Sequence, residues 1–344
     1  MRIRVLARGA TLVGLALTVV LSGCQILNHS NVANGAQGMI TWPKDGDLWV
    51  YDLATKQQTK ITNLSAGAAV TGATWSPDGT QVIYAQFWRR PNERSSGADL
   101  MIANADGSDA QPFAERDAPN TVLETPEWMP SGNVYYTIRR VVDGKETQTI
   151  MRQTERGQPE TVLENAYDPA ASPDESTLVY VRSTRTGQEL MKKSMGGSDD
   201  GCVLLSDQVF QYLSLPRISP DGTRVALGGS GEPNMGPSGC GGDPHSTTPP
   251  AAAGPNLDLG ALLQPETAYA HGLPADVWSM DLDGSDMKRI ADIKDDDPTV
   301  AFAPDGARMA IFGVASLFMV DANGGPTDKL TDQGGYGGLD WTAR

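Results

Sequence analysis

Apolar residues in this chain gather in short stretches that are separated by turn-forming residues. Stretches such as Gln81–Ala85 and Val134–Ile138 are rich in β-branched and aromatic residues, which is typical of sheet strands. No long run shows the 3.6-residue apolar spacing of a helix, and the chain contains 38 glycines and 23 prolines. The pattern therefore predicts many short strands joined by frequent tight turns.

One five-residue phrase recurs at the ends of predicted strands. It has an apolar or small residue first, Pro third, and Asp-Gly or a similar pair last. Pro fixes φ at the second turn position, and Asp and Gly complete a tight turn. The first residues of the copies are 53, 43, 47 and 84 positions apart, and the last interval contains an insertion. The copies are Trp75–Gly79, Trp128–Gly132, Ala171–Glu175, Ile218–Gly222 and Phe302–Gly306.

Each phrase begins a unit of four expected strands. A second strand follows it, a third ends in a polar turn such as Asn104–Ser108, and a weaker fourth closes the unit. Near the start, residues 38–62 supply a second, third and fourth strand without a first, and Gly338–Trp341 supplies a first strand alone. Repeats of this period and composition predict an all-β, six-bladed β-propeller over residues 38–344. Its four-stranded antiparallel blades are closed by the C-terminal strand joining blade one.

The phrases resemble the WD40-like (PD40) repeats of the family that includes the periplasmic protein TolB and the propeller domains of prolyl oligopeptidase-type peptidases. The resemblance covers nearly all of residues 38–344 and is specific for the fold. It says little about function, because this fold hosts enzymes, receptors and scaffolds. The extra α/β domains that these relatives carry are not expected here.

The N-terminus has the three parts of a signal peptide, with a basic start, an apolar stretch over 10–21 and small residues after it. Leu21–Cys24 resembles the lipobox of bacterial lipoproteins, which implies a signal peptide over 1–23 and lipid chains, of the palmitate kind, on Cys24. An ordinary signal peptide with a chance cysteine is the alternative. Residues 24–37 then form a lipidated, flexible tether. The expected location is extracytoplasmic, at the cell surface or in the periplasm, with the protein anchored to the membrane through Cys24.

The two remaining cysteines, Cys202 and Cys240, favour a disulfide over two free thiols, because the chain is expected to leave the reducing cytoplasm. This disulfide would fix a Gly/Pro-rich insertion at about 228–275 to the neighbouring repeat.

The net charge of -15 argues against nucleic acid as a partner. Cleavage of the signal peptide removes Arg2, Arg4 and Arg8, leaving 24 basic and 42 acidic residues, a charge of -18.

Catalytic and metal-binding patterns are weak in this sequence. A Gly-x-Ser-x-Gly nucleophile elbow is absent, and the three histidines lie in the tether or the insertion. Asp281–Asp286 could be a calcium loop, but a polar hairpin turn explains it as well. A metal on Cys240, Asp243 and His245 is a further alternative. We expect no catalytic residue, no metal site and no cofactor, and therefore no enzyme.

Basic and aromatic residues occur in the predicted connections between second and third strands, over 87–98, 139–146 and 182–189, which share one face with the insertion. We hypothesise that this face docks an anionic protein, cell-wall polymer or lipid headgroup. The alternative is a set of solvated loop charges with Trp88 packed inward. The predicted binding residues are Phe87, Trp88, Arg89, Arg90, Arg139, Arg140, Arg182 and Arg185.

The function favoured by the sequence is a membrane-tethered, non-enzymatic propeller that binds a protein or a cell-envelope component. One alternative is a small-ligand receptor or enzyme with its site at the central channel. Another is an accessory subunit of an envelope transport complex. Polar side chains converging at the channel mouth beneath the insertion would favour the first alternative.

Overall fold

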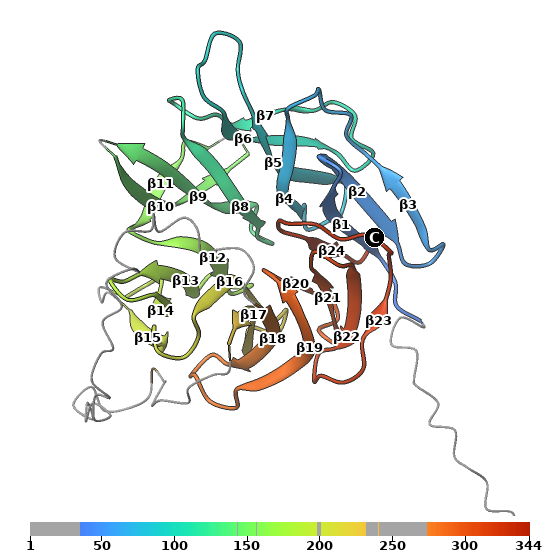
Figure 1. The fold of residues 1–344 in the computed structure, drawn as a ribbon, viewed down its shortest axis with the longest axis vertical. Coiled ribbons are helices and arrows are strands. Elements are labelled where there is room, and N and C mark those ends of the chain that lie inside the picture. The colour runs from blue at the N-terminus through green and yellow to red at the C-terminus, as the bar shows by residue number, and fades with distance from the viewer. Residues whose placement is uncertain (1–34, 143, 156, 198–200, 232–239, 241–273) are drawn as a thin grey trace, which may run out of the picture. The chain divides into compact units, whose positions relative to one another are not determined.

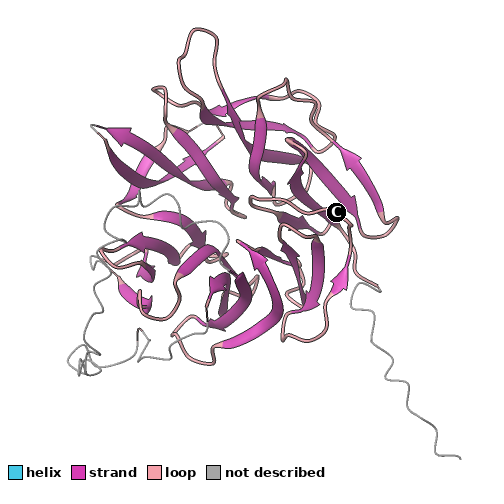
Figure 2. Ribbon diagram, in the orientation of Figure 1, coloured by secondary structure: helices cyan, strands magenta, loops and turns pink. Residues whose placement is uncertain are grey.

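The computed structural model describes residues 35–142, 144–155, 157–197, 201–231, 240 and 274–344. All regular elements in these residues are β-strands (Figures 1 and 2). The all-β prediction is confirmed for this part of the chain, where no helix could span a membrane. The predicted signal peptide and the lipidation of Cys24 lie outside the described residues.

Antiparallel meanders of four strands make up the sheets. The sheet built first along the chain comprises β24 (Asp340–Thr342), β1 (Met39–Lys44), β2 (Asp47–Asp52) and β3 (Gln57–Lys60). Three later sheets have four strands each. One contains β12 (Tyr167–Ala171), β13 (Thr177–Ser183), β14 (Gln188–Ser194) and β15 (Cys202–Leu205). The next contains β16 (Tyr212–Ile218), β17 (Arg224–Ser230), β18 (Pro274–Asp281) and β19 (Lys288–Asp296), and the last contains β20 (Thr299–Phe302), β21 (Arg308–Phe312), β22 (Leu317–Asp321) and β23 (Asp328–Lys329).

The remaining strands form an eight-stranded sheet, which consists of two meanders. A parallel bridge between Ala98 and Val122 joins them. The first meander contains β4 (Ala69–Trp75), β5 (Gln81–Trp88), β6 (Gly97–Asn104) and β7 (Gln111–Ala114). The second contains β8 (Val122–Trp128), β9 (Asn133–Val142), β10 (Lys145–Thr154) and β11 (Glu160–Glu164).

Both ends of the described chain meet in one sheet. Strand β24 pairs antiparallel with β1, with Trp341 opposite Ile40. The Trp341 indole also donates a hydrogen bond to the Gln37 carbonyl (3.0 Å), and Ala36 is buried. The predicted flexible tether over 24–37 is therefore wrong at its end, because Ala36 and Gln37 pack against the folded part of the chain.

The core lies between neighbouring sheets, where side chains of successive strands interdigitate. Trp42 of β1 and Phe312 of β21 are fully buried in one such cluster, together with Trp341. Burying side chains of this size contributes roughly 1.5–3 kcal/mol each. Each sheet is thus held mainly by its contacts with the next.

The recurring phrase folds as a turn with a repeated set of hydrogen bonds. The Ser219 hydroxyl donates to Asp221 (2.6 Å) and accepts from the Arg224 amide (3.0 Å). Ser76 and Ser172 make the corresponding contacts in their own turns. In the phrase that starts at Phe302, Ala303 takes the place of this serine and keeps the main-chain bond to Arg308 (2.8 Å).

The insertion is shorter than predicted at both ends. Gly228, within the predicted insertion, belongs to β17, and Ala275 belongs to β18, so the connection spans 231–273. Within it the structure describes Gly231 and Cys240. Cys240 forms the predicted disulfide with Cys202, with an S–S distance of 2.08 Å, so this prediction is confirmed.

We predict opposite effects for Ser219→Ala and Ala303→Ser. Removing the Ser219 hydroxyl leaves a strand amide without its acceptor, which should lower the free energy of unfolding by about 1–3 kcal/mol. Adding a hydroxyl at Ala303 should raise it by about 0.5–1.5 kcal/mol, because the turn already has the same main-chain frame. Urea unfolding of both variants measures the two changes. Destabilisation by Ala303→Ser equal to that of Ser219→Ala would contradict the assigned role.

Candidate functional site

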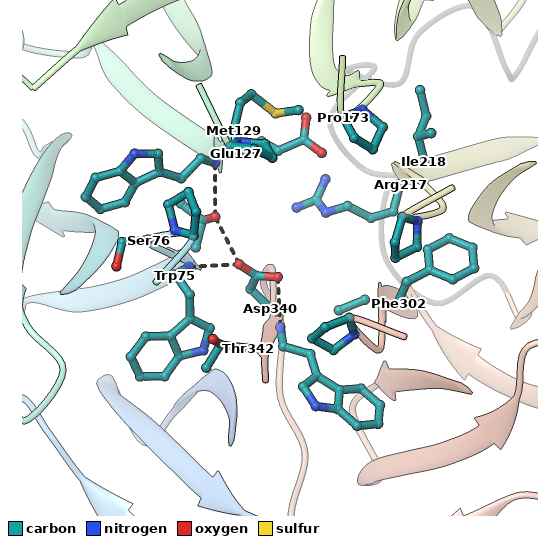
Figure 3. Close-up of a pocket in the computed structure, with 18 of the residues that line it drawn as sticks. Trp75, Ser76, Glu127, Met129, Pro173, Arg217, Ile218, Phe302, Asp340 and Thr342 are labelled. Carbon is teal, nitrogen blue, oxygen red and sulfur yellow. Dashed lines mark hydrogen bonds between the residues drawn. The ribbon is translucent and has the colours of Figure 1, made fainter. Parts of the chain in front are cut away.

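The strands that lead into the phrases meet at a common centre (Figure 1). These inner strands are β4, β8, β12, β16, β20 and β24, and each contacts the next in this order, with β24 also contacting β4. Where they end, they surround a pocket of about 340 Å³ (Figure 3).

The wall of this pocket is largely apolar and comes from the repeated phrase itself. Each copy contributes its proline, and the aromatic residues at or near the start of several copies add large flat surfaces. The C-terminal strand β24 contributes Trp341 at the equivalent place. The apolar lining includes Pro77, Pro130, Pro173, Pro220, Pro304, Trp75, Trp128, Phe302 and Trp341.

Four polar residues of the pocket share one position of the repeat, the residue just before the phrase. Side chains alternate between the two sides of a strand. This residue therefore faces the centre, whereas the first residue of the phrase packs between sheets. Bulges in the inner strands precede this position, for example between Glu124 and Glu127. Bulges of this kind redirect side chains. The polar residues at this position are Thr74, Glu127, Arg217 and Asp340.

Three of these side chains bind the main chain of the neighbouring inner strand. Asp340 accepts hydrogen bonds from the Trp75 amide (2.8 Å) and the Thr74 hydroxyl (3.0 Å). The Thr74 hydroxyl accepts from the Trp128 amide (3.1 Å), and dashed lines mark the bonds around Asp340 in Figure 3. Glu127 accepts from the Ala171 amide (2.8 Å). These contacts fix the positions of four neighbouring inner strands.

Arg217 points into the pocket toward Glu127 (Figure 3). Its Nη1 donates a hydrogen bond to the Pro216 carbonyl (3.0 Å). Within the described residues no carboxylate forms an ion pair with it. The guanidinium therefore has donors left for a guest in the pocket.

Burial changes the acidity of the pocket carboxylates. Desolvation raises the pKa of Glu127 from 4.5 to about 7, against the opposing attraction of Arg217. Desolvation also raises the pKa of Asp340, although the Trp75 amide favours its charged form. Part of the Glu127 side chain faces the pocket, but protein surrounds it on its other sides.

A second group of ionisable residues lies further along the inner strands. Asp168 of β12 is buried, and desolvation raises its pKa from 3.8 to about 7. Glu124 forms an ion pair with Arg139 (2.7 Å), yet burial still raises its pKa. The centre of the molecule therefore holds several carboxyl groups whose pKa is raised by burial.

The pocket lies at the opposite end of β17 and β18 from Ser230 and Ala275, the strand residues that flank the insertion in the sequence. Arg224 and Asp281 pair near the phrase, and Ser230 and Ala275 pair where the insertion leaves the sheet. Polar side chains thus converge at the centre, as one alternative required, at the phrase end of the inner strands; the insertion itself lies almost wholly outside the described residues.

Chemically, the lining is suited to binding. Among the described lining residues none is histidine or cysteine. The Ser76 hydroxyl is bound within its own turn to Asp78, a contact that recurs in the other phrases and is structural. The Glu127 and Asp340 oxygens hold main-chain amides. The arrangement can hold an apolar guest and offer it a guanidinium.

The residues of the predicted basic face are mostly paired. Trp88 ends β5 half-buried, and its indole donates to Asp99 (2.6 Å). Arg90 pairs with Asp99 (2.8 Å), which also holds the buried Arg116 (2.7 Å). Phe87, predicted to lie in a connection, belongs to β5.

Two of the predicted long connections are wrong. Arg139 and Arg140 lie within β9, and residues 143–144 alone join β9 to β10. Arg182 lies in β13, and residues 184–187 follow it. These segments form extended hairpins because the strands continue past the predicted ends.

Arginines in these hairpins also have carboxylate partners. Arg140 pairs with Asp117 (2.9 Å), and Arg182 pairs with Glu189 (2.6 Å). Arg89 and Arg185 are exposed. Docking of an anionic partner stays a prediction, and these pairs reduce the net positive charge on which it relies.

The structure bears on the two alternative metal sites, the turn that starts at Asp281 and the set of Cys240, Asp243 and His245. No group of three or more His, Cys, Asp or Glu side chains in the described part of the chain could hold a metal ion. Cys240 is committed to its disulfide, whereas Asp243 and His245 lie outside that part. In the turn that starts at Asp281, the Asp281 amide bonds the Ser285 carbonyl (2.9 Å), which confirms the hairpin turn.

The sequence analysis missed the pocket residues. Their signal was present, because each directly precedes a phrase, or its C-terminal equivalent at Trp341. Only Thr74, Glu127, Arg217 and Asp340 are polar there, whereas Ala170 and Ala301 occupy the same position elsewhere.

We predict that Asp168→Asn reduces the pH dependence of stability. The native chain keeps a proton on Asp168 that the unfolded chain releases near pH 4, so the free energy of unfolding falls as pH rises from about 4 through 7. The variant should be more stable than the wild type at pH 8 by about 1–3 kcal/mol and should gain little at pH 4. Asparagine also tolerates the positive φ of this residue (50°).

Urea unfolding between pH 4 and 8.5 measures this difference. Asp332→Asn is the control, because 98% of that side chain is exposed. Identical pH profiles for the wild type and Asp168→Asn would show that the buried carboxyl does not titrate as described.

Solved structures of similar shape exist, although no family model and no curated protein matches the sequence. TolB from Acinetobacter baumannii has a TM-score of 0.58 at 12% identity, over 88% of this chain and 66% of that one, so this chain spans about two thirds of its length. A putative TolB from Agrobacterium tumefaciens has a TM-score of 0.55 at 15% identity, over 89% and 98%. A chain of a nidogen/laminin complex has a TM-score of 0.57 at 9% identity, over 89% and 99%. The described part of this chain therefore has the β-propeller fold of TolB-type proteins.

Proposed function

We propose that this protein is a non-enzymatic binding propeller that works outside the cytoplasm, anchored to a membrane through Cys24. A segment of a partner polypeptide enters the pocket at the phrase end of the inner strands. The partner can belong to an envelope complex, in which case this chain is an accessory subunit. The observation that carries the proposal is the pocket itself, which has apolar walls and one guanidinium that forms no ion pair with the described residues.

Several observations support binding as the function. The carboxylates and the Thr74 hydroxyl in the pocket accept hydrogen bonds from main-chain amides, which supports a structural role for them and not a catalytic one. A disulfide between Cys202 and Cys240 agrees with a location outside the reducing cytoplasm. The similar chain from the nidogen/laminin complex belongs to a protein assembly.

We propose further that the propeller has six blades and is closed by β24. The eight-stranded sheet divides into two blades, because a parallel bridge of one residue pair joins its halves. Pairing of β24 with β1 completes the first blade from both chain ends. Contacts of β24 with β20 and β4 support closure.

Removing residues 339–344 should destabilise the whole propeller. The deletion exposes the partners of Leu339 and Trp341, both buried, and leaves β1 without its inner neighbour. We expect a loss of more than about 3 kcal/mol in the free energy of unfolding, from the burial of two large side chains. Urea unfolding gives the value, and removal of the exposed Arg344 alone is the control. An unchanged midpoint after the longer deletion contradicts closure by β24.

Photo-crosslinking tests the pocket as the partner site. Ala343 is exposed and lines the pocket, so Ala343→p-benzoylphenylalanine should give a covalent adduct with a polypeptide in intact cells. Gln58 on the exposed strand β3 is the control position and should give no such adduct. Equal adducts at both positions, or none at Ala343, would count against a partner in the pocket.

The same experiment separates anchoring from binding. Cys24→Ser should move the protein from the membrane to the soluble fraction, because a lipid chain is then missing. The purified soluble protein should still form the adduct at Ala343 when membrane extract is added. Retention of Cys24→Ser on membranes would argue against the anchor.

A further inference from the structure

Arg217 has hydrogen-bonding capacity that the described part of the chain does not use. A guanidinium carries five N–H donors, and the hydrogen bond of this one goes to the Pro216 carbonyl. Figure 3 shows the group extended into the pocket from β16. Nothing in the described residues pairs with its charge at ion-pair distance. A buried or half-buried cation of this kind usually has an anionic partner.

The nearest carboxylates are engaged elsewhere. Glu127 holds the Ala171 amide (2.8 Å). Asp340 holds the Trp75 amide (2.8 Å) with one oxygen and the Trp341 amide (2.7 Å) with the other. Both are attracted by Arg217, but neither reaches it as a salt bridge. The pocket therefore keeps a cation available for a guest.

The surroundings favour one kind of anion. Prolines and tryptophans wall the pocket, so a pair between the guanidinium and an entering carboxylate would be shielded from water and two-pronged. A doubly charged phosphate would meet repulsion from Glu127 and Asp340 when these ionise. A single carboxylate on an apolar group suits both the charge and the walls.

We propose that the pocket recognises its ligand through a carboxylate bound to the Arg217 guanidinium, with the ligand's apolar part against the proline and tryptophan walls. The inference rests on the proposed function, because it names the chemical group by which the same pocket recognises its ligand. The carboxylate belongs to a chain terminus, an acidic side chain or a small acid. A volume of about 340 Å³ accommodates one or two residues or a small aromatic acid.

Matched acids and amides test this inference. The probes are N-acetyl-glycyl-glycyl-phenylalanine, its C-terminal amide, N-acetyl-glycyl-glutamyl-phenylalanine amide, 3-phenylpropionate and 3-phenylpropionamide. Quenching of tryptophan fluorescence reports binding, because Trp75, Trp128 and Trp341 line the pocket. We expect at least one acid to bind about ten-fold or more tightly than its matched amide. The acid that binds best identifies the source of the carboxylate.

Variants assign the preference to Arg217. Arg217→Gln should reduce the acid-to-amide ratio to about one, and Arg217→Lys should keep part of it. Lys329→Gln, at an exposed cation of β23 that lines neither the pocket nor the predicted docking face, should leave the ratio unchanged. Thermal unfolding confirms that each variant is folded, and the ratio is independent of the folded fraction.

Three results would overturn the inference: equal binding of acids and amides, an acid preference that survives Arg217→Gln, or no binding of any acid at millimolar concentration. Adducts at Ala343 together with equal acid and amide binding would leave the proposed function standing without the carboxylate. Acid binding that needs Arg217, in the absence of any polypeptide adduct, would instead make the pocket a small-molecule site.

Discussion

Hydrogen bonds from side chains to the main chain of the next inner strand are the contacts on which the centre of this molecule depends. Asp340, Thr74 and Glu127 occupy the same repeat position and each holds an amide of the neighbouring strand. The amides of Trp75, Trp128 and Ala171 find their acceptors in these side chains, and an unsatisfied buried amide is costly. The contacts therefore join neighbouring four-stranded meanders around the pocket.

The same contacts explain why the centre is chemically unusual. A carboxylate that serves the wall must sit in a partly dry place, where burial raises its pKa. Burial raises the pKa of Glu127 to about 7 for this reason. Arg217 points toward Glu127 without forming an ion pair with it. The polar groups of the pocket are thus present because they hold the inner strands together, and the Arg217 guanidinium, which pairs with none of them, can bind a ligand.

Charge is distributed differently from what the sequence pattern suggested. The basic residues on 87–98 and in the β9 and β13 hairpins appear as a cluster in the sequence, yet Asp99, Asp117 and Glu189 neutralise several of them. These acids come from neighbouring strands or connections, so a count of basic residues in one segment misses them. Surface pairs of this kind add little stability, but they cancel the local field.

The sequence alone determined the strands, the turns and the pairing of the chain ends, because the phrase encodes a local turn and its period encodes a repeated sheet. It also determined the Cys202 to Cys240 disulfide, since few cysteines left few choices. Tertiary structure decided which residues face the centre: the bulges near Glu127 and Arg217 redirect side chains, and no local pattern specifies a bulge. It also decided which charges remain unpaired, because their partners come from other strands.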